Sequence, residues 1–393
     1  MLCATGFFAI FSTTMSKSPV LPLFTAYLGA DLSGVGLVAA VSSLTGIVAS
    51  VPAGILSDQW GRKRMLLVSS VVFATAPLLY LVVTDVWQLA AVRLYHGMAT
   101  AIFVPVSIAL VSDLFQKERG EKIGWFSTSM LLGRFIAPVM GGSIIGVLVM
   151  NPGVSYQAVY LVCGVAGVIV FFLSIKIPTS KRENRNTQKW RETFSAFQSV
   201  VSNRAILITA AVEAAILFAY GTFETFLPLY AIKNGITAYE VGLFLSAQVI
   251  TLALTKPLMG KFSDRHGRKS QIAIGTFIGA FGIASFSLAK GFVALIGISV
   301  LFGFSQSIVT SATAAYIADL SKGENRGSAM GLLGSIMDIG HTIGPLVSGL
   351  IATWLGFGAS FIGAGIVLCL AACMFLLLVS RPSSAMGGLN SPI

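Results

Sequence analysis

The chain has 393 residues, of which 55% are hydrophobic and only 10% are charged, and its mean hydropathy is +0.85. A soluble domain carries about 25% charged residues, so this composition excludes an ordinary water-soluble globular protein. The formal net charge of +11 does not indicate nucleic acid, because the sequence has no basic arm and no module of interleaved basic and aromatic residues. We therefore expect lipid around most of the chain and no nucleic-acid partner.

Twelve apolar stretches follow one another along the chain, each near the roughly 20 residues that a helix needs to cross the hydrocarbon layer. Their length and their lack of alternation favour helices over the strands of a barrel. The sequence thus predicts an all-α membrane protein with 12 transmembrane helices in two six-helix bundles. The stretches are roughly 4–28, 34–56, 65–84, 87–112, 123–148, 156–178, 205–231, 239–262, 270–289, 291–318, 328–355 and 357–379.

The longest polar segment separates the first six stretches from the last six. It contains Trp190, Phe194 and Phe197, which can line one face of a short interfacial helix, although a flexible basic tether fits the same residues. We expect four parts: an N-terminal six-helix bundle at 1–178, a cytoplasmic linker at 179–203, a C-terminal six-helix bundle at 204–380, and a tail at 381–393.

Positive charges are concentrated in alternate loops, and the opposite side has only Lys233 and Lys290. This bias predicts a multi-pass protein with both termini and the central loop in the cytoplasm. We expect it in a bacterial or archaeal inner (plasma) membrane. No basic region precedes the first apolar run, which argues against a cleaved signal peptide. The chain begins almost inside its first helix, and the sequence leaves open whether the native N-terminus extends further. The four cysteines lie in apolar stretches and are interpreted as small apolar residues.

A charged loop occurs twice. Gly54–Arg64 (GILSDQWGRKR) returns as Gly260–Lys269 (GKFSDRHGRK), and the aspartates inside the two loops are 206 residues apart. Asp319 follows Asp113 by the same 206 residues. Two motifs at one fixed spacing indicate two copies of one membrane unit. Related repeats around a central site are the means by which many secondary transporters achieve alternating access.

These motifs resemble those of the major facilitator superfamily over nearly the whole chain. The two loops resemble its signature between helices 2 and 3 and the counterpart between helices 8 and 9. Leu89–Gly97 (LAAVRLYHG) is similar to the helix 4 motif with a membrane-embedded arginine. Gly133–Gly142 (GRFIAPVMGG) is similar to the helix 5 motif of the proton-coupled drug exporters, with Ala137 where that pattern has glycine. Pro19 and Pro22 also fit the exporter branch.

The resemblance implies two charge clusters that hold the cytoplasmic side together while the cavity opens outward. In each loop, the first glycine lets another helix approach closely and the second permits a tight turn. The alternative is that these charges only fix the hairpins. The residues of this predicted cytoplasmic gate are Gly54, Asp58, Gly61, Arg62 and Asp113 in the first half, and Gly260, Asp264, Gly267, Arg268 and Asp319 in the second.

Charged residues inside the apolar stretches cost about 2.5–3.5 kcal/mol each at the bilayer centre, so we expect them to face a cavity or one another. Away from the ends of the stretches there are seven: Lys17, Arg93, Arg134, Glu213, Glu224, Lys256 and Asp338. Lys256 lies near a helix end, where its side chain can reach water, and receives no role.

Arg93 is the first candidate for coupling because of its match to the helix 4 motif. An arginine stays charged, so it can only tune a carboxylate that carries the proton. The candidate carriers are Glu224, Asp338 and Glu213, in that order. Three alternatives stay open. Arg93 can be a structural tie to backbone carbonyls, each carboxylate can form a buried pair with Lys17 or Arg134, and Asp338 can titrate together with His341, three residues away.

Three further side chains, Lys17, Arg134 and His341, are the candidates for the substrate cavity. The helix 5 motif and its copy in the second half supply the predicted helix-packing residues. These are Gly133, Pro138, Gly141, Gly142, Gly340, Gly344 and Pro345.

The leading functional hypothesis is proton-coupled efflux of a drug or metabolite by a monomeric transporter, with a small organic molecule as substrate and a proton gradient as driving force. The second is an anion or metabolite transporter, importing or exporting, that binds its substrate through Lys17 and Arg134. A membrane enzyme is disfavoured because the sequence has no nucleophile elbow, HExxH pair, phosphate loop or metal-ligand cluster. A non-transporting sensor is less favoured because no soluble module is evident. We expect no catalytic residue, metal or cofactor.

Overall fold

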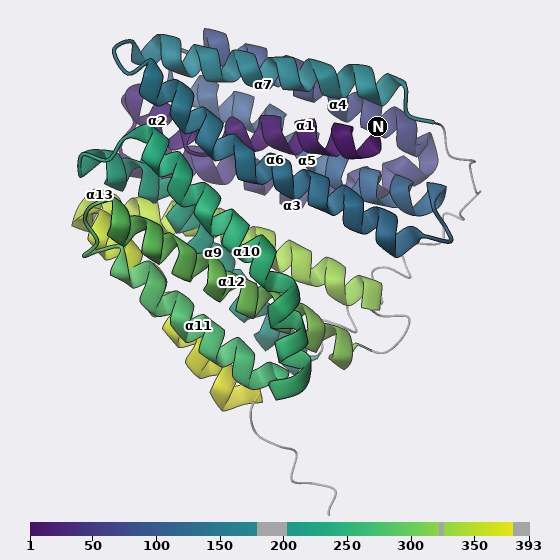
Figure 1. Ribbon diagram of the computed structural model, residues 1–393, viewed down its shortest axis with the longest axis vertical. Coiled ribbons are helices and arrows are strands. Elements are labelled where there is room, and N and C mark those ends of the chain that lie inside the picture. The colour runs from purple at the N-terminus through teal and green to yellow at the C-terminus, as the bar shows by residue number, and fades with distance from the viewer. Residues whose placement is uncertain (179–202, 322–325, 380–393) are drawn as a thin grey trace, which may run out of the picture.

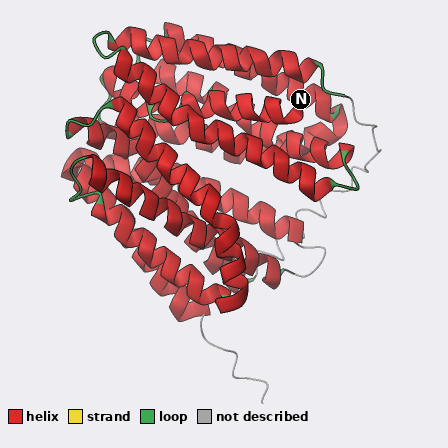
Figure 2. Ribbon diagram, viewed as in Figure 1, coloured by secondary structure: helices red, strands yellow, loops and turns green. Residues whose placement is uncertain are grey.

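The computed structural model describes residues 1–178, 203–321 and 326–379, and within these ranges it contains helices and no strand (Figure 2). Nine segments of the described part are long and apolar enough to cross a membrane. The predicted all-helical membrane fold is confirmed, while the count of twelve crossings stays a prediction. Nearly all of the expected linker lies outside the described residues, and so does the tail. The interfacial helix suggested for Trp190, Phe194 and Phe197 lies outside them too.

The N-terminal half contains α1 (Leu2–Met15), α2 (Val20–Tyr27), α3 (Leu32–Trp60), α4 (Arg62–Leu79), η1 (Tyr80–Val82), α5 (Val86–Leu114), α6 (Arg119–Val147) and α7 (Pro152–Ile175). The C-terminal half contains α9 (Arg204–Lys233), α10 (Ala238–His266), α11 (Arg268–Ser285), α12 (Phe292–Leu320) and α13 (Arg326–Val379). Figure 1 shows the helices of each half grouped together, with the two groups lying against each other.

Several helices begin at side chains that bind the free backbone N–H groups of the first turn. Asp31 accepts from the Gly34 N–H ahead of α3, and Asp85 accepts from two N–H groups ahead of α5. Thr237 and Glu240 form a capping box at the start of α10. The Ser33 hydroxyl and the Gly34 N–H lower the pKa of Asp31, because both stabilise its ionised form. These caps lie on one side of the molecule and fix where the chain re-enters the bundle.

The helices have two internal breaks: one interrupts a predicted stretch without a change in hydropathy, and the other falls between the predicted stretches 328–355 and 357–379. The first predicted stretch is interrupted between α1 and α2 by a turn at residues 16–19, which ends at Pro19. Helix α13 contains a non-helical residue, Gly356, with φ of +84°, so it consists of two helical segments joined at that point. A positive φ is accessible to glycine at little cost. The first of these breaks positions two residues of the functional site.

The two halves meet most closely on the side of the α9–α10 loop, called here the outer side. The opposite side, which bears the α3–α4 and α10–α11 turns, is called the basic side. A Cβ on Gly36 of α3 would lie 2.2 Å from the carbonyl oxygen of Pro345 in α13. A Cβ on Gly142 of α6 would lie 2.3 Å from that of Ala238 in α10. Figure 1 shows α6 and α10 diverging from this contact toward the basic side.

The outward surfaces of the helices are apolar, as a lipid-facing surface requires. Large side chains with exposed fractions above one half include Leu254, Leu258, Leu288 and Trp354. A soluble monomer does not expose apolar surface on this scale. Cys163 is buried and the other three cysteines are exposed on this surface, all with free thiols. The fold therefore agrees with an integral, multi-pass membrane protein.

Candidate functional site

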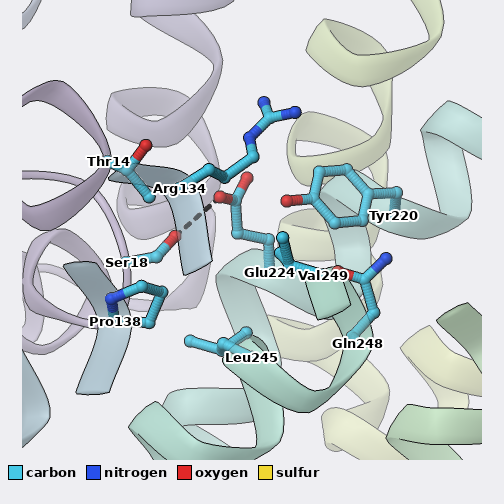
Figure 3. A pocket seen from close by; sticks show the side chains of 9 residues that line it. All are labelled: Thr14, Ser18, Arg134, Pro138, Tyr220, Glu224, Leu245, Gln248 and Val249. Atoms are coloured by element: carbon cyan, nitrogen blue, oxygen red, sulfur yellow. Dashed lines mark hydrogen bonds between the residues drawn. The ribbon is translucent and has the colours of Figure 1, made fainter. Parts of the chain in front are cut away.

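A pocket lies between the two halves, and we call it the central pocket (Figure 3). The N-terminal half contributes residues of α1, α6 and the α1–α2 turn, and the C-terminal half contributes residues of α9 and α10. A site at the interface of two related repeats is exposed to alternate sides when the repeats rock against each other. The lining residues are Thr14, Ser18, Arg134, Pro138, Tyr220, Glu224, Leu245, Gln248 and Val249.

An ion pair joins the two halves beside this pocket. Lys17 Nζ of the α1–α2 turn lies 2.7 Å from Glu224 Oε2 of α9, and the Glu224 side chain is only 8% exposed. Ser18 donates a 2.6 Å hydrogen bond to the other carboxylate oxygen of Glu224. His341 Nε2 of α13 lies 3.2 Å from Glu224 Oε2, and its Nδ1 lies 3.1 Å from Ser43 Oγ of α3. Glu224 thus binds groups from both halves at once.

The pairing decides between alternatives that the sequence left open. Glu224 pairs with Lys17, and Arg134 forms no hydrogen bond or ion pair with any described residue. Arg134 is exposed toward the pocket, and Figure 3 shows its guanidinium above the Glu224 carboxylate and facing Tyr220 across the pocket. The Arg134 guanidinium can therefore take up an anionic group of a ligand.

Asp338 and His341 do not form the pair that their spacing suggested. His341 is directed toward Glu224 and Ser43, whereas the Asp338 carboxylate lies one turn closer to the basic side, where it faces Gly46 of α3. Asp338 is half-buried and has no hydrogen bond or ion pair to its side chain among the described residues. Residues three apart on a helix share a face, but here each contacts a different level of α3.

Arg93 is 2% exposed and lies in the N-terminal half, away from the central pocket. Its guanidinium donates to hydroxyl groups of Ser42 at 2.9 Å, Tyr80 at 3.2 Å and Ser16 at 3.4 Å. No carboxylate of the described residues lies within ion-pair distance of it. Among the described residues, Arg93 therefore has neither of the partners that the sequence suggested. It bonds hydroxyl groups, and not the carboxylate of the coupling hypothesis or the backbone carbonyls of the structural alternative. Arg93 ties together α3, α5, η1 and the α1–α2 turn.

Glu213 lies 11 residues before Glu224 on the same helix, toward the basic side, and is 1% exposed. Its carboxylate contacts the hydroxyl of Thr313 in α12 at 2.5 Å. It has no ion-pair partner among the described residues. The two buried carboxylates of α9 thus lie in different surroundings, Glu224 among cations and Glu213 among apolar groups.

Each repeated loop forms an ion cluster within its own half. Arg62 lies 2.9 Å from Asp58 and 2.8 Å from Asp113, so it joins the α3–α4 turn to the end of α5. In the C-terminal half, Arg268 pairs with Asp264 at 3.0 Å and with Asp319. The pairing of one arginine with two aspartates and the sequence spacing are the same in both copies, as expected for a duplicated unit.

The glycines of the two loops differ in their surroundings. Gly61 and Gly267 have φ of +97° and +91°, so each loop turns sharply from one helix into the next. Around Gly54 and Gly260, no described atom lies within 4 Å of the position of a Cβ. The close helix approach expected there is therefore absent among the described residues. The close backbone contacts between the halves, such as that of Gly36 with Pro345, lie on the outer side instead.

Sequence comparison assigns the chain to a family. The model of the Major Facilitator Superfamily matches residues 2–247 and 215–391. The chain belongs to this superfamily. An uncharacterized MFS-type transporter of Methanocaldococcus jannaschii is 27% identical over 344 residues, which cover 86% of this chain and 87% of that protein. The multidrug resistance protein MdtG of Proteus mirabilis is 27% identical over 357 residues, covering 87% and 86%.

A solved structure of the nucleoside transporter NupG matches with a TM-score of 0.81 at 15% identity, covering 96% of this chain and 99% of that one. At this identity the likeness shows the fold alone. The chain is thus a membrane transporter of the major facilitator superfamily rather than an enzyme. Among its described residues, no group of three His, Cys, Asp or Glu side chains could hold a metal ion.

In this superfamily member, the glycines of the helix 5 motif and its copy are contact points between backbones. A Cβ on Gly133 would lie 2.6 Å from Phe7 O of α1. A Cβ on Gly340 would lie 2.1 Å from the carbonyl oxygen of Ala214 in α9, and a Cβ on Gly344 would lie 2.3 Å from that of Phe218. These two glycines therefore let α13 pack closely against α9. Gly141 packs on side chains of the α1–α2 region, and Ala137 is fully buried where the exporter pattern has glycine.

Sequence reasoning missed several polar residues of the transporter's pocket, among them Ser18, Tyr220 and Gln248. None is charged, so none carried the signal used to select Lys17 or Glu224. Gln248 is 1% exposed and its side-chain amide bonds Gln306 of α12 at 2.5 Å. Buried carboxamides in an apolar stretch are costly unless paired, and this cost is the signal that could have identified Gln248.

Proposed function

We propose that this protein is a proton-coupled exporter of a small organic molecule that works by alternating access, with Glu224 as the coupling carboxylate. One observation carries the proposal. Glu224 is a buried membrane carboxylate of the C-terminal half that lies beside His341 and binds Lys17 and Ser18 of the N-terminal half. A proton on Glu224 removes the charge that attracts Lys17. Protonation therefore loosens a contact between the halves and favours the other conformation.

The direction of transport rests on the helix 5 motif and on relatives such as MdtG, which is named a multidrug resistance protein. The order of the candidate carriers is Glu224 first, then Asp338 and Glu213. Asp338 lacks a cation partner among the described residues, so its protonation would release no contact of the kind made by Glu224. Arg93, buried away from the pocket, acts on coupling through the α1–α2 turn that bears Lys17.

Purified protein in proteoliposomes with an imposed pH gradient tests the proposal, with ethidium as cationic probe and benzoate as anionic probe. We expect the wild type to move one probe faster with the gradient than without it, and Glu224→Gln to lose this dependence. Glu240→Gln is the matched control, because glutamine preserves the capping box at the start of α10. Gradient-dependent transport by Glu224→Gln at the wild-type rate would refute the role of Glu224.

A second candidate function is transport of an organic anion, which is favoured by one observation. Arg134 faces the central pocket without an ion-pair partner among the described residues, while Lys17 is neutralised by Glu224. Of the two cations named by the sequence, only Arg134 is thus available to a ligand. If this function is correct, Arg134→Gln raises the KM for benzoate and leaves that for ethidium unchanged. An equal change for both probes would assign Arg134 to the structure of the pocket.

A further inference from the structure

Glu213 is a carboxylate enclosed by the apolar interior of the C-terminal half. Ile216 and Val212 flank it on α9, and Val309 and Ala312 flank Thr313 on α12; all four are fully buried. Burying an ionised carboxylate without a cation is so costly that such a group normally becomes neutral. Glutamate at this position therefore needs a reason beyond packing, since leucine or glutamine would fit the site at lower cost.

The hydrogen-bond geometry at Thr313 indicates which protonation state of Glu213 the structure contains. Thr313 Oγ1 lies 2.5 Å from Glu213 Oε2 and 2.9 Å from the carbonyl oxygen of Val309. A hydroxyl group has one proton, so it cannot donate fully to both acceptors. Both contacts are satisfied if Glu213 is protonated and donates to Thr313, while Thr313 donates to Val309.

A stripe of polar groups runs from Glu213 to the central pocket. Thr313, Thr310 and Gln306 follow one another at spacings of three and four on one face of α12. The Thr310 hydroxyl is buried and has no hydrogen-bond partner among the described residues, and Gln306 bonds Gln248, which lines the pocket. An unpaired buried hydroxyl is rare in protein interiors. The Thr310 hydroxyl is therefore available to bind a water molecule between Gln306 and Thr313.

Few charges of the neighbouring helices reach Glu213. The field of Lys256 of α10 reaches it, but that side chain is exposed and forms no ion pair with it. On α12 the nearest acidic residue is Asp319, which is paired with Arg268 of α11. On α13, Asp338 faces α3. No described cation therefore forms an ion pair with Glu213, and only the distant charge of Lys256 acts on its ionised form.

We propose that Glu213 is a second proton-binding site, on the basic side of the pocket, which receives the coupling proton from Glu224. This inference rests on the proposed function. When Glu224 pairs with Lys17 it releases its proton to water in the central pocket. Water molecules that bridge the side chains of Gln306, Thr310 and Thr313 then pass a proton to ionised Glu213, which becomes neutral. Glu213 then releases the proton to water on the basic side. The structure corresponds to the stage at which Glu224 is ionised and Glu213 holds the proton.

Infrared spectroscopy of the purified protein tests the protonation of Glu213 without any substrate. The wild-type spectrum minus that of Glu213→Gln should contain the carbonyl band of a protonated carboxylic acid. Thr313→Val should shift this band, because it removes the hydrogen-bond partner. Thr276→Val is the matched control, since the buried Thr276 hydroxyl bonds only the carbonyl four residues earlier. A difference spectrum with carboxylate bands in place of the acid band would overturn the proposal.

Proteoliposomes then test the role of the site in coupling. For the probe that the wild type moves, Glu213→Gln should lose transport driven by the pH gradient but retain probe counterflow at equal pH, because the pocket is intact. Coupled transport by Glu213→Gln at the wild-type rate would refute the inference while leaving the role of Glu224 standing. A wild type without gradient dependence would refute the proposed function instead, and the infrared result would still decide whether Glu213 binds a proton.

Discussion

At the scale of residues, the two buried basic groups of the N-terminal half are stabilised in different ways. Lys17 pairs with a carboxylate of the other half, so its environment changes when the halves move. Arg93 bonds only hydroxyl groups of its own half. Hydrogen bonds to a charged group each contribute about 1.5–3 kcal/mol, so Arg93 contributes more to the integrity of one half than to the contact between halves.

Replacing Arg93 with alanine should abolish proton-coupled transport while membrane insertion persists. The substitution frees Ser16 and Ser42 from the guanidinium and leaves the turn that bears Lys17 without this tie. We expect a loss of about 3 kcal/mol in the free energy of unfolding, the order expected when buried hydrogen bonds to a charged group are removed. Transport in proteoliposomes and thermal unfolding in detergent measure the two effects.

Ser42→Ala serves as the comparison for Arg93, since it removes one of the three bonds and leaves the charge in place. We expect a stability loss of about 1 kcal/mol and only reduced transport. Coupled transport unchanged in Arg93→Ala would exclude Arg93 from the mechanism. Equal loss of transport in both variants would show that the single bond to Ser42, rather than the charge, is what matters.

At the scale of helices, α6 and α10 meet through backbone rather than through side chains. The described contacts run from Gly142 and Ala238 to a hydrogen bond from Ser246 to the carbonyl oxygen of Phe135, 2.7 Å away. Small residues let helices approach to this distance in lipid, where no hydrophobic driving force brings them together. A methyl group added to Gly142 would therefore be enough to disturb this contact.

Gly142→Val should separate the halves on the outer side and slow transport. Its Cβ would lie 2.3 Å from Ala238 O, and backbone at this distance has to move. Gly146→Ala, one turn along the same helix, is the matched control, because its nearest neighbour would be the Tyr239 Cβ at 3.7 Å. Overpacking costs about 1–3 kcal/mol, which shifts the conformational equilibrium away from this closed outer side. Transport rates of the two variants give the comparison, and similar rates would show that the contact is dispensable.

The sequence was a good guide to the helices and a poor guide to the pairing of their charges. About twenty apolar residues in a row suffice to predict a spanning helix, but polar ends such as Ser57-Asp58-Gln59 extend α3 beyond its predicted limit. The break at residues 16–19 was not predicted, because it interrupts the helix without interrupting the apolar run. Lys17 and Glu224 were both singled out, yet residues 207 positions apart can be paired only when the packing of the two halves is known.

The repeats explain why the candidate gate was easier to predict than the candidate pocket. A duplicated loop leaves the same residues at one fixed spacing, and in both ion clusters one arginine pairs with the two corresponding aspartates. The pocket has no such duplication. Its charges are cationic in the first half and acidic in the second, so its function depends on the difference between the halves and leaves no repeated pattern.

At the scale of the whole molecule, alternating access requires the outer contact between the halves to open and close. Replacing Gly146 of α6 and Tyr239 of α10 with cysteine tests this, because a Cβ on Gly146 would lie 3.7 Å from the Tyr239 Cβ. Disulfides have Cβ–Cβ distances of about 3.5–4.5 Å, so the pair should oxidise in the conformation described here. The four native cysteines are first replaced with alanine or serine.

Oxidation of this double variant should stop transport, and a reducing agent should restore it, since the bond joins parts that have to separate. Free-thiol counts measure the bond and proteoliposome transport measures its effect. Each single-cysteine variant serves as a control and should be insensitive to oxidant. If the disulfide forms and transport continues, the outer contact does not open during the cycle. Substrate would then have to pass without the rocking of one half against the other, and the role assigned to the Lys17–Glu224 pair would lose its basis.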